Sequence, residues 1–414
     1  MNKVKLGEIL KIKHGFAFKS ENYVDESKYA LVTLANISPT NNFQFNREKT
    51  TFYGASFPDG FALKDDDLIM PLTEQVVGLF GNTAFVPKIE GITFVLNQRV
   101  GKVVPVEGKA DKYYLHYLLA TDLVKDQLEY RASGTRQRNI SPDDIYDVEV
   151  FVPDINTQKS IGKYLYDIER KVNLNHAIND NLEQQSKLLY DYWFTQFDFP
   201  DENGKPYRSS GGKMVWNELL KRDIPADFRV VPFLEVASWE SNSQPAKNKF
   251  IYEQKEGYVR FIQNRDYNSN TYITYIPMTQ TLSVVDRFDI LMDKYGDAGA
   301  VRYGLEGAFN VALGKICVHN QNYKEYIRSF LSSDGIYNYL HNSCMASTRA
   351  SLNESNLAML NILIPDENII FEYEKLLHKI RLSILQNNDE TQILIDLRDW
   401  LLPMLMNGQA TIIE

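Results

Sequence analysis

The 414-residue sequence predicts an α+β protein with two tandem globular domains rich in short strands, each followed by one long helix. Three features predict this class: an internal repeat, two segments with a seven-residue apolar period, and a turn-rich stretch between the copies. The chain is also longer than a domain with a single hydrophobic core usually is. We expect the two long helices to pair as an antiparallel coiled coil, which gives the chain pseudo-twofold symmetry.

The seam of this coiled coil is predicted from apolar residues and one Asn at heptad spacing in each copy. In the first copy the seam residues are Ile161, Leu165, Ile168, Val172, Asn175, Leu182 and Leu189. In the second copy they are Tyr373, Leu377, Ile380, Ile384, Asn387, Leu394 and Leu401, each numbered 212 higher than its counterpart (387 − 175 = 212). An Asn at the same central position of both segments favours mutual pairing, because a buried amide needs a polar partner. The alternative is that each helix packs separately on its own globular domain.

The repeat continues into the globular parts. Residues 67–70 resemble 289–292, residues 97–102 resemble 310–315, residues 133–136 resemble 346–349, and residues 145–153 resemble 357–365. Strands are predicted at 30–34, 67–70, 83–86, 100–104, 148–152, 258–262, 290–292, 313–318 and 360–364. Shorter helices are predicted at 112–130 and 323–341.

These elements divide the chain into five parts. We expect a first globular domain at 1–155, a long helix at 156–198, a linker at 199–228, a second globular domain at 229–367, and a second long helix with the C-terminal tail at 368–414. Two similar domains in one chain fit the local twofold symmetry of DNA, on which two-headed proteins bind two half-sites. Repetition alone is not specific for DNA binding.

Motifs for catalysis and for cofactors are missing from the sequence. The 22 glycines never form Gly-x-Gly, which excludes the usual dinucleotide turn and the similar turn for S-adenosylmethionine. No phosphate-binding Gly-x4-Gly-Lys-Ser/Thr occurs, and the six histidines never have metal-ligand spacing. The two cysteines are too few for a disulfide framework or a cysteine zinc site. We therefore expect no catalytic residue, no metal and no cofactor on this chain.

One pattern in the sequence resembles the metal site of a nuclease. Pro153-Asp154 followed by Glu169 and Lys171 formally matches a Pro-Asp…Glu-x-Lys metal site. Such a site needs Glu and Lys on a strand, where alternate side chains share one face. In the predicted helix the two side chains lie about 200° apart around the axis. A solvated helix face is the favoured interpretation of both residues.

The formal net charge of −9 and the pI of about 5.4 give no support for DNA binding by the chain as a whole. Residues 351–400 carry much of the acidic surplus, which places it mainly on the second long helix. The N-terminus lacks the apolar core of a signal peptide, and no apolar stretch is long enough for a membrane span. The expected location is cytoplasmic.

Several segments resemble one protein family. They are GFAFKS (15–20), SGTRQRNISPDDI (133–145), FVPDINTQK (151–159) and LRDWLLPMLMNG (397–408). In their order and duplication they are similar to the specificity (S) subunits of type I restriction-modification systems, and the resemblance covers nearly the whole chain. It implies two target-recognition domains, each reading half of a split sequence in double-stranded DNA, with the paired helices as a ruler.

The resemblance also implies partners. Two methyltransferase (M) subunits and restriction (R) subunits would assemble with the chain, and methylation, ATP-driven translocation and cleavage would reside in them. S-adenosylmethionine, ATP and Mg would accordingly be bound by the partners. The loop 71–75 departs from the family pattern because it lacks the basic residue common there, whereas the loop 294–299 fits the pattern better.

Candidate DNA contacts are polar residues in loops and on one edge strand, because basic groups bind phosphates and amides read base edges. In the first domain they are Lys11, Lys13, His14, Arg131, Thr135, Arg136, Gln137 and Arg138. In the second domain they are Gln263, Asn264, Arg265, Lys294, Tyr295, Arg302, Thr348 and Arg349. The alternatives are a solvated loop, or lysines that protect an edge strand from aggregation.

Two other functions stay open at this stage. A stand-alone metal-dependent nuclease would depend on Glu169 and Lys171. A protein-only adaptor would use the coiled coil and need no DNA contact.

Overall fold

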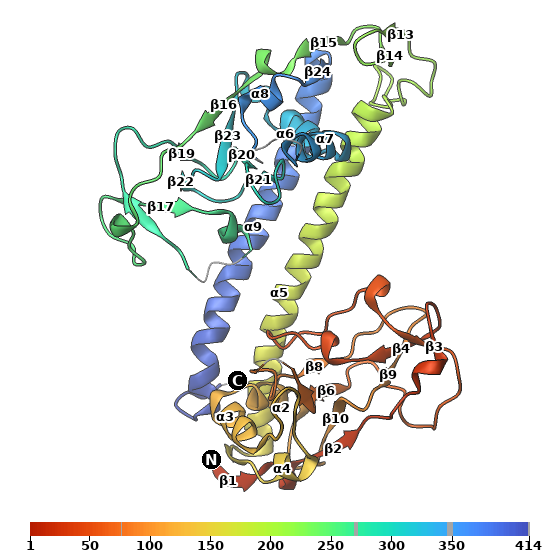
Figure 1. Cartoon of the computed structure of the whole chain (residues 1–414), viewed down its shortest axis with the longest axis vertical. Helices are drawn as coiled ribbons and strands as arrows, with labels where there is room; N and C mark the ends of the chain where they lie inside the picture. The colour runs from red at the N-terminus through yellow and green to blue at the C-terminus, as the bar shows by residue number, and fades with distance from the viewer. Residues whose placement is uncertain (76, 269–271, 346–350, 413–414) are drawn as a thin grey trace. The chain divides into compact units, whose positions relative to one another are not determined.

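The computed structural model of the chain describes residues 1–75, 77–268, 272–345 and 351–412 (Figure 1). The chain forms two compact units: the first is Met1–Leu174 with Glu390–Glu414, and the second is Asn175–Asp389. The long helices α5 (Ile155–Tyr190) and α9 (Glu367–Met406) each contribute one part to each unit. Within the described residues, no helix combines the length and the apolar character that crossing a membrane requires.

The first unit contains two four-stranded sheets. One is antiparallel, in the order β2 (Leu10–His14), β10 (Val100–Pro105), β6 (Leu68–Pro71) and β8 (Ala84–Phe85). The other has the order β3 (Tyr23–Val24), β5 (Phe52–Tyr53), β4 (Tyr29–Val32) and β9 (Thr93–Leu96), with β4 and β9 parallel. Two short pairs join β1 (Asn2–Lys5) to β12 (Glu149–Val152), and β7 (Thr73–Glu74) to β11 (Arg138–Asn139). The helices are α1 (Leu6–Ile9), α2 (Lys112–Leu119), α3 (Asp122–Arg131) and α4 (Pro142–Tyr146).

The second unit repeats this plan. Its antiparallel sheet has the order β16 (Ala237–Ser241), β23 (Leu313–Val318), β20 (Ile290–Asp293) and β21 (Val301–Arg302). Its other sheet has the order β18 (Tyr275–Pro277), β17 (Tyr258–Ile262), β22 (Gly307–Phe309) and β19 (Val284–Val285), with β17 and β22 parallel. Strand β15 (Arg229–Pro232) pairs with β24 (Asn361–Ile364), as β1 does with β12. The helices are α6 (Lys324–Ser332), α7 (Asp334–Met345) and α8 (Glu354–Leu357). The predicted α+β class with an internal repeat is confirmed, and every predicted strand overlaps an observed one.

The predicted helices 112–130 and 323–341 are each two helices, so their predicted continuity is wrong. Both break at a hydroxyl residue that bonds back to the preceding turn. Thr121 Oγ1 donates to the carbonyl of Leu118 (2.7 Å), and Ser333 Oγ donates to that of Phe330 (2.7 Å). Such back-bonding competes with the helical hydrogen bonds of the backbone. The two breaks are also 212 residues apart (333 − 121 = 212), so the repeat includes them.

The long helices pair in antiparallel fashion. In the first unit Lys171 of α5 forms an ion pair with Glu390 of α9 (3.1 Å). In the second unit Asn175 Nδ2 donates to the carbonyl of Asn387 (3.4 Å), and Asn387 Nδ2 donates to Asn179 Oδ1 (2.8 Å). The expected mutual pairing through the Asn positions is therefore present. All of the predicted seam residues are buried or half-buried.

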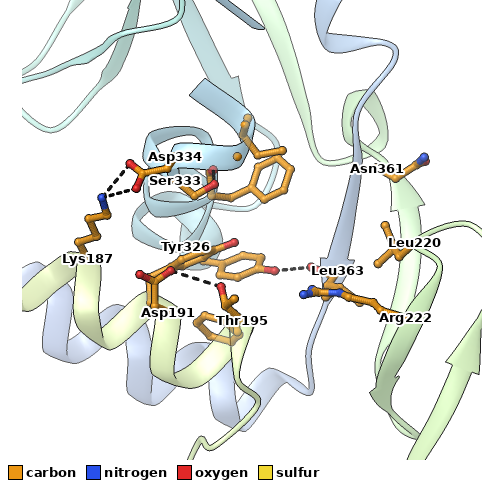
Figure 2. A pocket seen from close by; sticks show the side chains of 15 residues that line it. Lys187, Asp191, Thr195, Leu220, Arg222, Tyr326, Ser333, Asp334, Asn361 and Leu363 are labelled. Atoms are coloured by element: carbon orange, nitrogen blue, oxygen red, sulfur yellow. Dashed lines mark hydrogen bonds and ion pairs between the residues drawn. The ribbon is translucent and has the colours of Figure 1, made fainter. Parts of the chain in front are cut away.

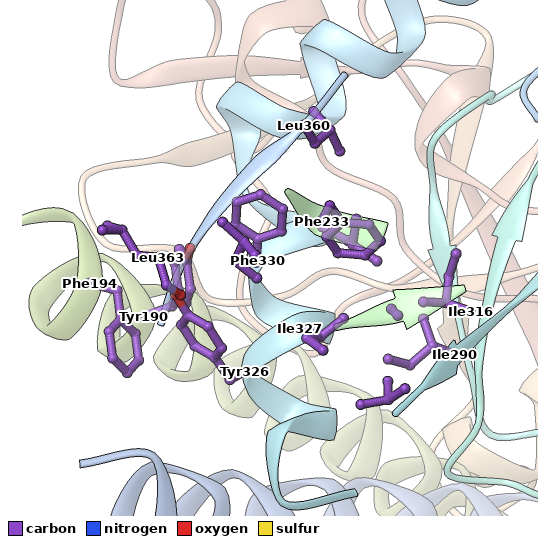
Figure 3. Close-up of a cluster of buried hydrophobic side chains, with 14 of the residues drawn as sticks. Tyr190, Phe194, Phe233, Ile290, Ile316, Tyr326, Ile327, Phe330, Leu360 and Leu363 are labelled. Carbon is purple, nitrogen blue, oxygen red and sulfur yellow. The ribbon is translucent and has the colours of Figure 1, made fainter. Parts of the chain in front are cut away.

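The segment predicted as a linker is part of the second unit rather than a bare connector. After α5 a π-helical turn, Asp191–Thr195, leads into it, and it carries the hairpin β13 (Met214–Asn217) and β14 (Arg222–Pro225). Its buried residues Phe199, Ile224 and Phe228 join the main core of that unit. Figure 3 shows a part of this core. There Tyr190 at the end of α5 and Phe194 of the π-helical turn lie beside Tyr326 of α6 and Leu363 of β24.

Candidate nucleic-acid interface

One end of the antiparallel sheet gathers several candidate residues of the first unit. Gly101 of β10 lies opposite His14 of β2 on one side and Met70 of β6 on the other. The loops after β2 and β6 and the loop before β10 therefore meet at this end. The chain after β6 forms β7, which pairs with β11 through Glu74 and Arg138.

The side chains of Lys11 and Lys13 on β2 are exposed and point away from the core. Lys11 Nζ donates to the carbonyl of Gly7 (3.0 Å) and lies 5.0 Å from the ring centre of Tyr146. Lys13 Nζ donates to the carbonyl of Gly60 and lies over the ring of Phe61. Neither ammonium group has a carboxylate partner within the part of the chain that the structure describes. Both positive charges can therefore act on an anion in solvent.

The loop before β11 is a tight hairpin with an exposed tip. The backbone groups of Ser133 and Asn139 bond to each other in both directions (2.9 and 2.8 Å). Gly134 has φ +109°, and a Cβ there would lie 2.2 Å from the carbonyl oxygen of Gln137, so only glycine fits. The three residues that follow it, at 135–137, are exposed. Thr135, Arg136 and Gln137 are thus placed where a DNA backbone or base edge could reach them.

The other two arginines of this loop region are bound to the protein itself. Arg138 Nη1 forms an ion pair with Glu74 Oε1 (2.8 Å), and its Nη2 donates to the carbonyl of Glu129 (2.6 Å). Arg131 donates to the carbonyls of Gln127 (3.1 Å) and Asp147 (3.3 Å). The geometry gives both a supporting role. That they also contact DNA stays a prediction.

In the second unit the polar residues after β17 form a connected network. Gln263 is held by two hydrogen bonds: its backbone N–H donates to Asp266 (3.0 Å), and its side-chain amide donates to Thr274 Oγ1 (3.2 Å). Asn264 Nδ2 donates to Asp293 Oδ1 (2.9 Å). Arg265 is exposed and lies 3.7 Å from Asp266. Arg265 is therefore the most accessible of the three candidates.

Asp293 is the centre of this network. Its side chain is almost fully buried and forms an ion pair with Arg302 (2.8 Å), which also reaches Asp297 (3.3 Å). Burial raises the pKa of Asp293, and the hydrogen bond from Arg302 opposes that rise. Arg302 is thus paired with two carboxylates, which reduces its attraction for a phosphate.

Lys294 is buried at the same end of the second sheet. Its Nζ donates to Ser241 Oγ (2.9 Å) and lies 5.5 Å from the ring centre of Trp239. Burial lowers its pKa. No carboxylate pairs with it within the described ranges. The neighbouring Tyr295 is 49% exposed, whereas the candidates Thr348 and Arg349 lie outside the described residues.

The two sheet ends correspond position by position. Ser241 lies opposite Gly314 as His14 lies opposite Gly101. The backbone N–H of Leu72 donates to Arg99 O (2.9 Å), and that of Lys294 donates to Ala312 O (2.8 Å). Lys294 therefore occupies in the second unit the position that Leu72 has in the first. The scaffold is shared, but the side chains on it differ.

Arg99 lies at the same end of the first sheet, and the sequence interpretation did not select it. Its side chain is exposed, and it lies directly before β10. The sequence feature that could have identified Arg99 is its place in the repeated segment 97–102, directly before a predicted strand. The exposed guanidinium of Arg99 adds to the positive charge at this end of the sheet.

The nuclease-like pattern does not form a site. Glu169 is 7% exposed, so its assignment to a solvated helix face is wrong. Its Oε2 accepts a hydrogen bond from the hydroxyl of Tyr117 (2.8 Å) and lies 3.4 Å from His116 Nε2. Lys171 is exposed and paired with Glu390, as expected for a solvated face. Among the described residues no group of three His, Cys, Asp or Glu side chains could hold a metal ion.

A pair of variants separates exposed loop residues from supporting ones. Replacing Arg136 and Gln137 by alanine should change the free energy of unfolding by less than about 0.5 kcal/mol, because both side chains are exposed. Replacing Arg138 by alanine should cost about 3 kcal/mol, because it leaves the buried carboxylate of Glu74 unpaired. Urea unfolding measures both. Equal stability of the two variants would show that the Arg138 ion pair is not structural.

The double variant at Arg136 and Gln137 also gives a prediction for DNA binding. For the chain assembled with its partners, the double variant Arg136→Ala with Gln137→Ala should weaken DNA binding about tenfold or more. The difference in affinity between the parent and the variant should be smaller at high salt, because salt weakens phosphate contacts. Fluorescence anisotropy with a labelled duplex measures this. Unchanged affinity would remove the 135–137 tip from the interface.

Comparisons with known proteins cover most of the chain. The model of the family described as type I restriction modification DNA specificity domain matches residues 1–184 and 225–396. The type I restriction enzyme MjaIX specificity subunit of Methanocaldococcus jannaschii is 22% identical over 331 residues, which cover 77% of this chain and 73% of that protein. The HindI specificity subunit of Haemophilus influenzae is 24% identical over 337 residues (67% and 72%). In fold, the chain is similar to the S subunit of a type I restriction-modification system from M. genitalium, with a TM-score of 0.65, 14% identity and coverage of 98% and 96%.

Proposed function

Because this chain belongs to the family of type I restriction modification DNA specificity domains, we propose that it reads a two-part DNA sequence. Each globular unit reads one half of the target, and the paired helices α5 and α9 set the length of the unread spacer. The chain is not itself an enzyme in this proposal. It provides the sequence specificity of a larger complex.

The observation that carries the proposal is the repeated scaffold with different side chains. The antiparallel sheets of both units have equivalent strand orders and the same hydrogen bonds at one end. In the first unit this end presents His14, Arg99 and the tip 135–137, and in the second it presents Ser241 and Lys294. Two copies of one scaffold with different polar groups suit two half-sites of different sequence.

The helix pair supports the role of a ruler. A ruler must have one register, because a slip would change the distance between the half-sites. Asn179 Nδ2 donates to Asn388 Oδ1 (2.8 Å) and its Oδ1 accepts from Asn387 (2.8 Å), so amides of both helices satisfy each other. A different register would leave the buried amide of Asn179 without these partners, which costs about 1–3 kcal/mol for each unsatisfied group.

The charge of the chain supports a division of labour with partner subunits. With a formal net charge of −9, the chain alone should bind DNA poorly. In the proposed complex, two M subunits supply further phosphate contacts and bind S-adenosylmethionine for methyl transfer. R subunits bind ATP and Mg for translocation and cleavage.

A selection experiment tests whether this chain provides the specificity. A random duplex library is incubated with the methyltransferase partner alone, with this chain alone, and with both, and the retained DNA is sequenced. We expect one enriched motif only when both proteins are present. The control is the same methyltransferase with a specificity subunit of different target, which should enrich a different motif. The same motif with both specificity subunits would contradict the proposal.

A further inference from the structure

A cavity of about 340 Å³ lies within the second unit, and none of the candidate DNA contacts lines it. Its walls come from the end of α5, from β14, from β24 and from the junction of α6 and α7 (Figure 2). Much of the lining is aromatic: Tyr190, Phe194, Tyr326 and Phe330. This size is in the range of small-ligand sites, whose walls are largely apolar with a few placed polar groups.

Arg222 brings a positive charge into this cavity. Its half-buried side chain extends from β14 toward Leu363 and Tyr326 in Figure 2. The guanidinium lies 4.8 Å from the ring centre of Phe197. Within the described residues no carboxylate forms an ion pair with it, and no hydrogen bond from its side chain is present. Burial lowers the pKa of Arg222, as expected for a cation without a counter-charge.

Four other arginines of comparable or greater burial each have a carboxylate partner. Arg138 pairs with Glu74, Arg302 with Asp293, and Arg328 and Arg381 with Glu325. A half-buried guanidinium without such a partner is costly, because it loses hydration and gains no ion pair. The unit therefore tolerates at Arg222 a cost that it avoids at these other positions. An anionic ligand would remove that cost.

Several other polar groups of the cavity are already engaged. Lys187 Nζ forms an ion pair with Asp334 (2.7 Å), and the hydroxyl of Tyr326 donates to the carbonyl of Leu363 (2.7 Å). Asp191 accepts a hydrogen bond from Thr195 Oγ1 (3.3 Å). Arg222 is thus the group best able to select a ligand. The two aspartates in the lining also disfavour a highly charged anion such as a phosphate dianion.

We propose that this cavity binds a carboxylate carried on an apolar or aromatic group. The guanidinium of Arg222 holds the carboxylate, whose two oxygens match its planar fork. The rings of Tyr190, Phe194 and Tyr326 pack against the apolar part. Such a group occurs on a free aromatic acid and at the end of a polypeptide whose last residue is apolar, and both present the same chemistry to the cavity.

The first test uses the unmodified full chain and needs no variant. Isothermal titration calorimetry compares N-acetyl-L-phenylalanine, which carries the carboxylate, with N-acetyl-L-phenylalaninamide, which has the same ring but no charge. We expect saturable binding of the acid and at least tenfold weaker binding of the amide. Equal affinity for the two, or no binding of the acid up to its solubility, would overturn the proposal.

The second test assigns the binding to Arg222. In Arg222→Gln the affinity for the acid should fall at least tenfold, whereas Arg208→Gln, a change at an exposed arginine of the same segment, should leave it unchanged. Near-ultraviolet circular dichroism shows whether each variant keeps the native aromatic packing. If the folded Arg222→Gln variant binds the acid as well as the parent chain, the proposal is wrong.

A third comparison distinguishes the two sources of the ligand. A hexapeptide ending in a free phenylalanine is compared with the acid and with the same hexapeptide amidated at its end. Tighter binding of the free hexapeptide than of the acid supports a chain end as the ligand. Binding of the acid alone supports a small aromatic acid. Equal binding of the free and amidated hexapeptides contradicts the role of the carboxylate.

Discussion

Glu325→Gln should lower the free energy of unfolding by about 3 kcal/mol, because it removes the buried carboxylate that pairs with two buried arginines. Glu325 lies at the start of α6 and is 2% exposed. It forms ion pairs with Arg328 (3.0 Å) and Arg381 (3.2 Å), both also buried. The neutral amide can still accept a hydrogen bond but cannot offset either charge. Urea unfolding of the full chain measures the loss.

The loss should depend on pH. Although burial would raise the pKa of Glu325, the guanidinium groups of Arg328 and Arg381 hold it below its ordinary value of 4.5. A depressed pKa means that the carboxylate stabilises the fold above pH 4.5 and that this contribution is lost as the pH falls through the folded pKa. The difference between the parent and Glu325→Gln should therefore shrink below about pH 4.5.

An exposed ion pair provides the matched control. Glu218 pairs with Lys221 (2.9 Å) on side chains that are 78% and 72% exposed. Glu218→Gln should change the unfolding free energy by less than about 0.5 kcal/mol. A loss for Glu325→Gln no larger than this would mean that the buried pairs do not stabilise the second unit.

Lengthening both long helices by one heptad should lengthen the unread spacer of the DNA target by about three base pairs. Seven residues add about 10 Å of helix, and a base pair adds about 3.4 Å. The insertions belong next to Asn175 in α5 and next to Asn387 in α9, where the two helices are in contact. An inserted heptad with the same seam pattern keeps the apolar residues in phase.

The half-site sequences should not change in this variant, because the sheet ends and their loops are untouched. The control inserts seven residues in the exposed turn at 202–205 of the segment after α5, which should leave the spacer as it is. A spacer that stays the same when both helices are lengthened would contradict the role of α5 and α9 as a ruler.

The repeat and the helix pair could be predicted from the sequence because periodic burial leaves a periodic pattern. Leu165 and Leu377 are fully buried at the same heptad position of their helices, and Asn175 meets Asn387 across the pair. The sequence did not predict the breaks at Thr121 and Ser333. A hydroxyl residue can either continue a helix or bond back to a carbonyl, and composition does not distinguish the two.

The candidate site could be predicted only in part, because charge in a sequence does not reveal its partner. Arg136 and Arg138 are two residues apart, yet the first is exposed and the second is paired with Glu74, which is 64 residues away in the chain. Glu169 looked like a surface residue until His116 and Tyr117 proved to face it. Only the fold decides which charged side chains remain free for a ligand.

The most direct test of a two-part DNA reader is a map of methylated bases. The chain is co-expressed with its methyltransferase partner in a host that lacks other DNA methylation, and modified bases are located by single-molecule sequencing. We expect a motif of two short specific parts separated by a stretch of fixed length and no sequence preference. A single short continuous motif would contradict it.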